Sequence, residues 1–137
     1  MSLVLDSSVT IAWCFADEVT PAVETVFDRI GDTGAFVPTL WRLEVANALQ
    51  SGVRRGRLSA HQRDCLLALL ADLDVRADMD TDRYAWNGTL RLSERYRLSL
   101  YDAAYLELAL RLALPLATLD VELRTAADAV GLQVLGA

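Results

Sequence analysis

The sequence predicts an α/β fold, a three-layer α/β/α sandwich around a central parallel sheet of four to five strands. Short apolar segments alternate with longer segments of helical periodicity along the chain. Because most of these short segments are continuously apolar, we expect helices to cover both faces of the sheet. The 137 residues contain no linker, repeat or low-complexity run, so residues 1–137 are expected to form a single domain.

The predicted strands are the short segments between helical patterns. Each has four or five residues, a length typical of buried strands. They are LVLD (3–6), AFVP (35–38), VRADM (75–79), PLATL (115–119) and LQVL (132–135).

Helices are predicted between these strands from periodicity and from their start and stop residues. Pro21 stands at a favoured first helical position, Ser59 is placed to cap a helix, and Gly56 is placed to end the preceding one. The predicted helices are residues 8–15, 21–32, 39–55, 59–72, 81–96, 100–113 and 121–130.

The composition excludes several kinds of chemistry. All 13 basic residues are Arg, so P-loops and Schiff bases that depend on Lys are excluded. The single His, His61, stands in a predicted first helical turn, where we expect an exposed structural residue and no catalytic triad. Cys14 and Cys65 are far apart and have no His cluster to share a metal, so reduced, packed thiols are expected. Acid–base chemistry is left mainly to carboxylates.

The chain shows no targeting or membrane signal. Its first residues, MSLVLDSS, have no basic region and reach Asp6 early, unlike a signal peptide. Glu107, Arg111 and Pro115 interrupt the most apolar region before the roughly 20 apolar residues that a membrane span needs. A cytoplasmic protein is expected.

Three acidic residues stand where a carboxylate is unusual. Asp6 and Asp120 close predicted strands, at the edge where open α/β sheets bind ligands, although each can also cap the helix that follows. Glu44 lies in an apolar stripe with Leu40 and Ala48 at four residues on either side, so it is expected to serve a function.

Asp102 allows two interpretations. With Ser99 it forms the pattern of a capping box, in which its carboxylate returns a bond to the backbone. Alternatively, Glu107 and Arg111 mark the solvent face of the helix, and Asp102 then points toward buried surface. Four acids gathered without Lys or His would repel one another, and a divalent cation relieves that repulsion. Ligation by oxygen alone favours Mg²⁺ or Mn²⁺ over Zn²⁺.

Four motifs follow one another along the chain: VLDSSV, EVANAL, LYDAAYLELA and LATLD. Each is weak alone, but the ordered set at this spacing is specific. With these motifs the whole chain resembles the PIN-domain ribonucleases, and especially the VapC toxins of type II toxin–antitoxin pairs. The resemblance implies a PIN-like sandwich, a metal-dependent endoribonuclease that acts as a toxin, a homodimer and a cognate VapB-like antitoxin.

The resemblance also implies the site residues. Thr118 and Ser8 would orient carboxylates or a metal-bound water, and the same role stays open for Ser7. One or two Mg²⁺ ions, with Mn²⁺ as the alternative, would assist hydrolysis of RNA by water, leaving 5′-phosphate and 3′-hydroxyl ends. Four carboxylates are carried over as catalytic residues and metal ligands: Asp6, Glu44, Asp102 and Asp120.

A net charge of −6 disfavours a polyanionic substrate unless basic residues gather locally. The densest basic run is SGVRRGRLS, with Arg54, Arg55 and Arg57. Two interpretations stay open: these residues bind RNA phosphates, or they complement a helix C-terminus and face solvent. Four aromatic residues are expected in the core or at an interface and not as base-stacking platforms: Trp13, Trp41, Trp86 and Tyr105.

Two other functions compete with a nuclease. A phosphatase of the haloacid dehalogenase type would use Asp6 and Thr10, but Ser8 stands where that family has its second Asp. The other is a PIN-fold binding module that pairs with protein or RNA and does not cut. Such a module would have no reason to keep four costly acids, so the sequence favours the nuclease.

Overall fold

Five parallel strands form one sheet at the centre of the molecule, in the order β3-β2-β1-β4-β5. The computed structural model describes residues 1–137. Every strand lies within its predicted range, so the predicted parallel α/β fold is confirmed. The strands are β1 (Val4–Leu5), β2 (Ala35–Pro38), β3 (Val75–Asp78), β4 (Leu116–Ala117) and β5 (Val134–Leu135).

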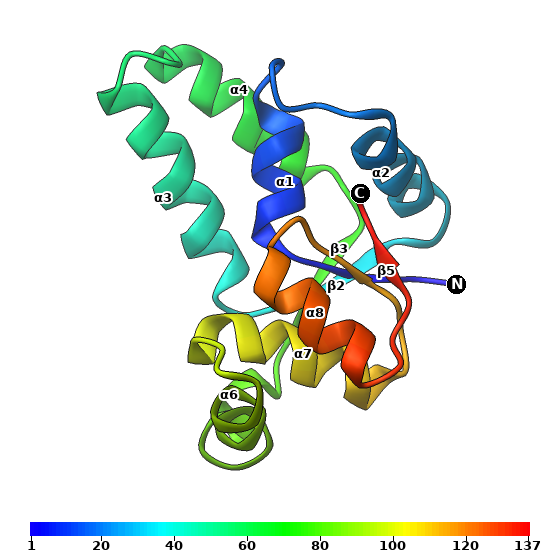
Figure 1. Cartoon of the computed structure of the whole chain (residues 1–137). Helices are drawn as coiled ribbons and strands as arrows, with labels where there is room; N and C mark the ends of the chain where they lie inside the picture. The colour runs from blue at the N-terminus through cyan, green and yellow to red at the C-terminus, as the bar shows by residue number, and fades with distance from the viewer.

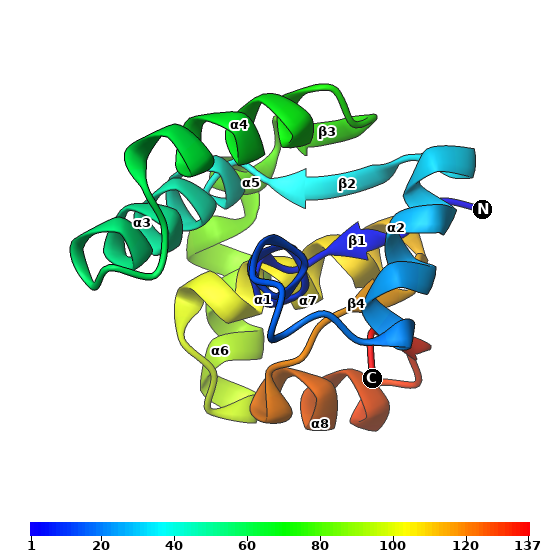
Figure 2. The same ribbon diagram turned by 90° about the horizontal axis from the view of Figure 1, so that it is seen from above.

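Helices cover both faces of this sheet. In Figures 1 and 2, α1 and α2 lie on one face, α7 lies on the other, and the α3–α4 hairpin extends past the carboxyl ends of the strands. The helices are α1 (Ser7–Cys14), α2 (Pro21–Thr33), α3 (Trp41–Arg54), α4 (Ala60–Ala71), α5 (Thr81–Tyr84), the π-helical turn η1 (Ala85–Thr89), α6 (Leu90–Tyr96), α7 (Leu100–Leu112) and α8 (Val121–Ala129).

The helix ends follow the sequence signals. Thr20 caps α2 through a bond from the Val23 N–H, and Pro21 opens the helix. Ser59 and Gln62 form a capping box at α4. Gly56 follows the end of α3 with φ +75°, a left-handed conformation that glycine adopts without strain.

The helix α7 is buried almost all round, because it lies between the sheet and the segment formed by η1 and α6. The prediction that Glu107 and Arg111 mark its solvent face is therefore wrong. Glu107 is only 8% exposed. The two residues do pair, at 2.8 Å, but Arg111 also binds Asp78 at the end of β3, at 2.6 Å, and its guanidinium lies over the Tyr84 ring. Asp78 and the Tyr84 ring cover the pair, and the second carboxylate helps to compensate the cost of burying the Arg111 charge.

Residues 81–96, predicted as one helix, form three pieces: α5, η1 and α6. The interruption contains Asn87 and Gly88, which are weak helix formers. The Asn87 side chain accepts the Gly88 N–H at 2.6 Å and so competes with the regular helical bonds. The result is a widened π turn in the middle of the segment.

Three of the four aromatic side chains expected in the core or at an interface are at least partly buried. Tyr105 is fully buried, Trp41 is 5% exposed, and Trp13 stacks on Phe27 with ring centroids 4.8 Å apart. Trp86 lies outside the core, because it sits on the π turn and is 90% exposed, and the alternative of an interface stays a prediction.

The two cysteines form no disulfide, as expected. Cys14 is packed, whereas Cys65 is exposed on α4, so the expectation of two packed thiols holds only for Cys14. His61 is exposed in the first turn of α4, as predicted. None of the helices has the length and apolar character needed to span a membrane.

Candidate active site

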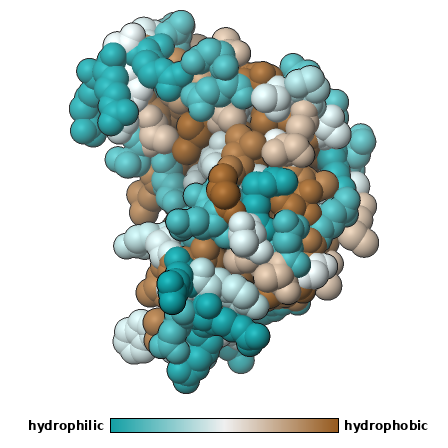
Figure 3. Space-filling view, viewed as in Figure 1, coloured by the Kyte–Doolittle hydropathy of each residue, from teal (hydrophilic) through white to brown (hydrophobic).

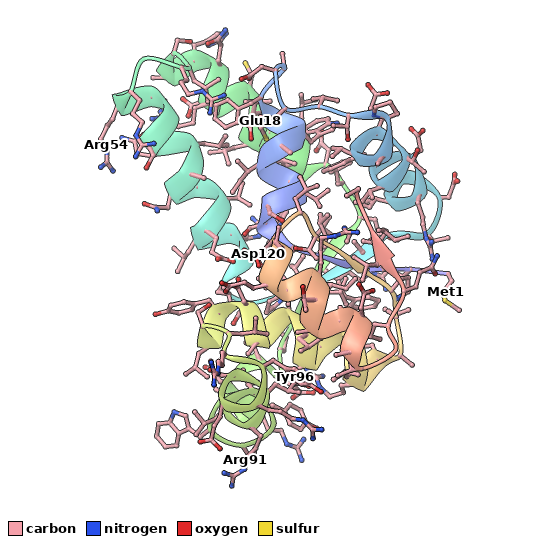
Figure 4. The ribbon with its side chains drawn as sticks, viewed as in Figure 1. Met1, Glu18, Arg54, Arg91, Tyr96 and Asp120 are labelled. Atoms are coloured by element: carbon pink, nitrogen blue, oxygen red, sulfur yellow. The ribbon has the colours of Figure 1, made fainter.

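The carboxyl ends of β1 and β4 bring two of the candidate acids to one edge of the sheet. The strands are neighbours, with Leu5 paired to Ala117, and the Asp6 N–H donates to the Ala117 carbonyl at 2.9 Å. Asp6 directly follows β1, and Asp120 comes three residues after β4. In Figure 4, Asp120 lies at the start of α8, beside the start of α1.

Asp6 is held by hydroxyl groups from two segments that are far apart in sequence. Ser8 Oγ donates to its Oδ2, and Thr118 Oγ1 donates to the same oxygen at 2.8 Å. The Asp6 residue is only 3% exposed. It occupies the N-cap position of α1 without making a side-chain cap bond, so the capping alternative is wrong for this residue. The carboxylate is free for another role.

Thr118 and Ser8 connect this carboxylate to the rest of the loop after β4. Thr118 Oγ1 accepts the Asp120 N–H at 3.1 Å, and Ser8 Oγ accepts the Leu119 N–H at 3.0 Å. One oxygen of Asp120 accepts the Leu123 N–H at 2.8 Å and caps α8, as the capping interpretation predicted. Asp120 thus has one oxygen in a cap and a second oxygen that makes no such bond.

Glu44 lies in the first turn of α3 and is fixed by a partner on α7. The Tyr105 hydroxyl donates to Glu44 Oε1 at 2.6 Å. Sequence reasoning placed Tyr105 in the core and missed this contact. A signal was present, because Tyr105 lies three residues after Asp102 and therefore on the same face of α7. Burial raises the pKa of Glu44, and the Tyr105 and Ser7 hydroxyls oppose that shift.

Asp102 lies in the first turn of α7 and is partly buried. Its N–H donates to Ser99 Oγ at 3.1 Å, which is half of the expected capping box. Burial raises the pKa of Asp102 to about 6, and the negative charges of Asp6, Asp120 and Glu44 add to the shift.

The acids therefore share one electrostatic environment. Burial also raises the pKa of Asp6 and of Glu44, against the opposing effect of their hydroxyl donors. The charges that act on the pKa values of Asp6, Glu44 and Asp102 come from other carboxylates, and no arginine is among them. Carboxylates arranged in this way hold excess negative charge next to buried surface, a situation that favours protons or a cation.

No three His, Cys, Asp or Glu side chains stand close enough together to hold a metal ion by themselves. The acids are coupled in charge but do not form a closed ligand cage. Mg²⁺ commonly binds through one or two carboxylates and keeps several waters, so an open set of oxygen donors fits this ion. Zn²⁺ does not fit, because the site offers neither His nor Cys.

The basic run SGVRRGRLS divides into two kinds of arginine. The Arg57 guanidinium binds Asp17 at 3.0 Å and Glu18 at 3.2 Å, and it lies 4.0 Å from the centre of the Phe15 ring. These contacts favour a structural role for Arg57. Arg54 and Arg55 are exposed, and Figure 4 shows Arg54 at the end of α3 far from Asp120.

Comparison with known proteins gives the family. The model of the PIN domain family matches residues 3–129, so the chain belongs to the PIN domain family. The crystal structure of PAE2754 from Pyrobaculum aerophilum superposes with a TM-score of 0.70 at 24% identity, covering 98% of this chain and 92% of that one. That similarity shows the PIN fold. A search of curated proteins found no match. The PIN domain is a nuclease fold, so the four carboxylates lie in a framework suited to cutting nucleic acid.

Proposed function

We propose that this protein is a metal-dependent endoribonuclease whose catalytic residues are Asp6, Glu44, Asp102 and Asp120. One observation carries the proposal. Partly or fully buried carboxylates from four separate elements act on one another at one edge of the sheet, with no cation among the charges that shift the pKa values of Asp6, Glu44 and Asp102. Repulsion between these carboxylates does not stabilise the fold. A catalytic site that binds a cation is therefore the best explanation for why the carboxylates lie together.

The proposed cofactor is Mg²⁺, with Mn²⁺ as the alternative. When bound, the ion would activate water and stabilise charge on the phosphate during phosphodiester hydrolysis. Asp6, Asp102 and the uncapped oxygen of Asp120 would hold it, directly or through the waters that Mg²⁺ retains, and Glu44 would complete the set or position water. Thr118 and Ser8 orient the Asp6 carboxylate, so that its second oxygen keeps a constant direction.

The experiment is incubation of purified protein with total RNA in Mg²⁺, in Mn²⁺ and in EDTA, followed by sequencing of the fragment ends. We expect discrete cuts with 5′-phosphate ends that EDTA abolishes. Asp6→Asn and Asp102→Asn should each abolish cutting, whereas Asp72→Asn, which changes an exposed acid at the end of α4, should not. Equal behaviour of wild type and the site variants, with folded protein and metal present, would leave a non-cutting binding module as the function.

The proposal extends to a toxin that acts in the cytoplasm as a homodimer with a VapB-like antitoxin. The resemblance of the four motifs to VapC supports it, together with exposed apolar side chains next to the acids. Leu43, beside Glu44, is 76% exposed, and Tyr101, beside Asp102, is 67% exposed. They line a groove of about 330 Å³ that a protein partner could cover. Growth arrest on expression, relieved by the product of a neighbouring gene, would test the toxin role, and sedimentation would test the dimer.

A further inference from the structure

Positive charge gathers on α5, η1 and α6 in a chain that is acidic overall. Residues 81–97, from the start of α5 to the residue that caps the end of α6, hold four arginines, one aspartate and one glutamate, a net charge of +2 in a protein of net charge −6. All four arginine side chains are exposed, and none of them forms a salt bridge. These helices lie at the lower end of the molecule in Figure 1, and the same end is mostly hydrophilic in Figure 3. The arginines are Arg83, Arg91, Arg95 and Arg97.

An unpaired aromatic side chain stands in the same segment. Trp86 is 90% exposed, whereas the other two tryptophans have partners: Trp13 stacks on Phe27, and Trp41 donates its indole N–H to Thr10. A tryptophan with nearly its whole surface in water gives up the hydrophobic stabilisation that burial provides. The widened turn η1 is what presents it to solvent.

This segment continues directly into the acidic site. Arg97 ends α6, and two residues later Ser99 caps α7, whose first turn carries Asp102. Both η1 and α6 pack against α7. In Figure 4, Asp120, Tyr96 and Arg91 follow one another from the centre of the molecule to its lower end. The end of α6 therefore lies next to the helix whose first turn carries Asp102.

We propose that α5, η1 and α6 form a binding surface for single-stranded RNA, called here the α5–α6 surface. The inference rests on the proposed function, because it names where the RNA next to the cut phosphate lies. Exposed guanidinium groups match backbone phosphates, and an indole face matches an unpaired base. A duplex hides its base faces, so single-stranded RNA fits this combination of groups better. The positive charge also offsets the repulsion that the acidic site exerts on RNA.

The test uses the full chain and a single-stranded oligoribonucleotide of mixed sequence in EDTA. Binding should quench the tryptophan fluorescence of the wild type, because Trp86 is the exposed tryptophan. In Trp86→Phe the quenching should be lost while the RNA, followed by anisotropy of an end label, still binds. Trp86→Ala should weaken binding at least about fivefold, as loss of one stacked base does.

Two double variants with equal charge change provide the matched comparison. Arg91→Ala/Arg95→Ala should weaken binding about tenfold and flatten the dependence of log affinity on log salt by about 1.4, since each phosphate contact to a single strand contributes about 0.7. Arg54→Ala/Arg55→Ala removes two arginines that are also exposed and unpaired, but lie at the end of α3. It should change affinity less than twofold.

Equal effects of the two double variants would overturn the inference, because general charge would then account for binding. Trp86 fluorescence that responds to protein concentration and not to RNA would also overturn it in favour of contact with another protein copy. The two proposals fail separately. If the wild type cuts RNA and Arg91→Ala/Arg95→Ala binds normally, only the α5–α6 surface is wrong. If that variant loses binding but the wild type never cuts, only the nuclease proposal is wrong.

Discussion

The hydroxyl of Tyr105 donates a hydrogen bond to Glu44 Oε1 at 2.6 Å and joins α7 to α3 across the acidic site. Tyr105 is fully buried, so its ring position is set by the core. Glu44 lies in a first helical turn, where its side chain has free rotamers unless something holds it. The hydrogen bond from a buried, fixed ring therefore restricts the Glu44 carboxylate to one orientation.

Tyr105→Phe should lower RNA cleavage about tenfold, in the range seen when a residue that orients a metal ligand is lost. The ring still fills the core, so the circular dichroism spectrum should not change. The hydrogen bond lowers the pKa of Glu44, so its loss should raise that pKa further and weaken Mg²⁺ binding at pH 6.5 more than at pH 8. The measurement is cleavage rate against Mg²⁺ concentration at both pH values. Identical Mg²⁺ curves for variant and wild type would show that Glu44 needs no such partner.

The Thr118 hydroxyl should support both stability and activity. Thr118→Val keeps the shape but leaves the buried Asp6 carboxylate without one of its two side-chain donors and the Asp120 N–H without its acceptor. We expect the free energy of unfolding to fall by about 1–2 kcal/mol and cleavage to fall with it. Thr118→Ser retains the hydroxyl and should recover most of both. Urea unfolding of the three proteins is the measurement, and a Ser variant as impaired as Val would point to the lost methyl group instead.

The sequence predicted the strands well because each is a short apolar segment with helices on either side, and local pattern is enough to find such segments. Asp6, Glu44 and Asp120 were singled out for a similar reason, since each breaks a local pattern: the ends of two strands and the apolar face of one helix. Asp102 was singled out through the solvent-facing pair Glu107 and Arg111, which is in fact buried, and the role of all four acids stays a prediction. Contacts between elements were harder. The place of Tyr105 on the same face of α7 as Asp102 was readable from the spacing, but its partner Glu44 was not, and neither was the pairing of Arg111 with Asp78, because each contact depends on how two elements pack.

The same limit explains one error and the exposure of one tryptophan. Glu107 and Arg111 have the spacing of a solvent-facing pair, but spacing along one helix cannot show that a strand end covers the pair. Trp86 lies in an apolar helical pattern, but Asn87 and Gly88 widen the turn and direct it outward. In both cases the exposure of the side chain depends on which elements pack around the helix, and that packing cannot be inferred from the pattern of a single sequence.

The metal-free protein should lose stability as pH rises toward neutrality. The pKa of Asp102 is raised from 3.8 to about 6 in the folded protein, so between these values the folded protein holds a proton that the unfolded chain has lost. Stability from this group is therefore fully present below about pH 3.8 and lost as pH rises to 6. Asp6 and Glu44, whose pKa values are also raised, act in the same direction.

Asp102→Asn should remove part of this effect. In EDTA at pH 7.5 we expect the variant to be more stable than wild type by about 1 kcal/mol, less than the whole shift implies because water partly screens the side chain. Mg²⁺ should stabilise wild type at pH 7.5 and the variant much less. Unfolding by urea at pH 5 and 7.5, with and without Mg²⁺, measures both effects. A variant less stable than wild type at pH 7.5 without metal would contradict the proposed repulsion.

Replacing Arg111 should destabilise the fold strongly, because this residue holds together a largely buried cluster of ion pairs. Arg111 is the only cation in contact with the buried carboxylates of Glu107 and Asp78, and it also covers the Tyr84 ring. Arg111→Leu leaves two acids buried without a partner, so we expect the free energy of unfolding to fall by about 3 kcal/mol or more.

The matched control is Arg76→Leu, which breaks an exposed pair with Asp74 and should cost less than about 1 kcal/mol. A second test separates unpaired charge from lost packing. Arg111→Leu should recover stability at pH 4.5 relative to pH 7.5, because protonation then neutralises the stranded acids. The measurement is urea unfolding of the three proteins at both pH values. If Arg111→Leu and Arg76→Leu lose equally little at pH 7.5, the cluster contributes no more than an ordinary surface pair.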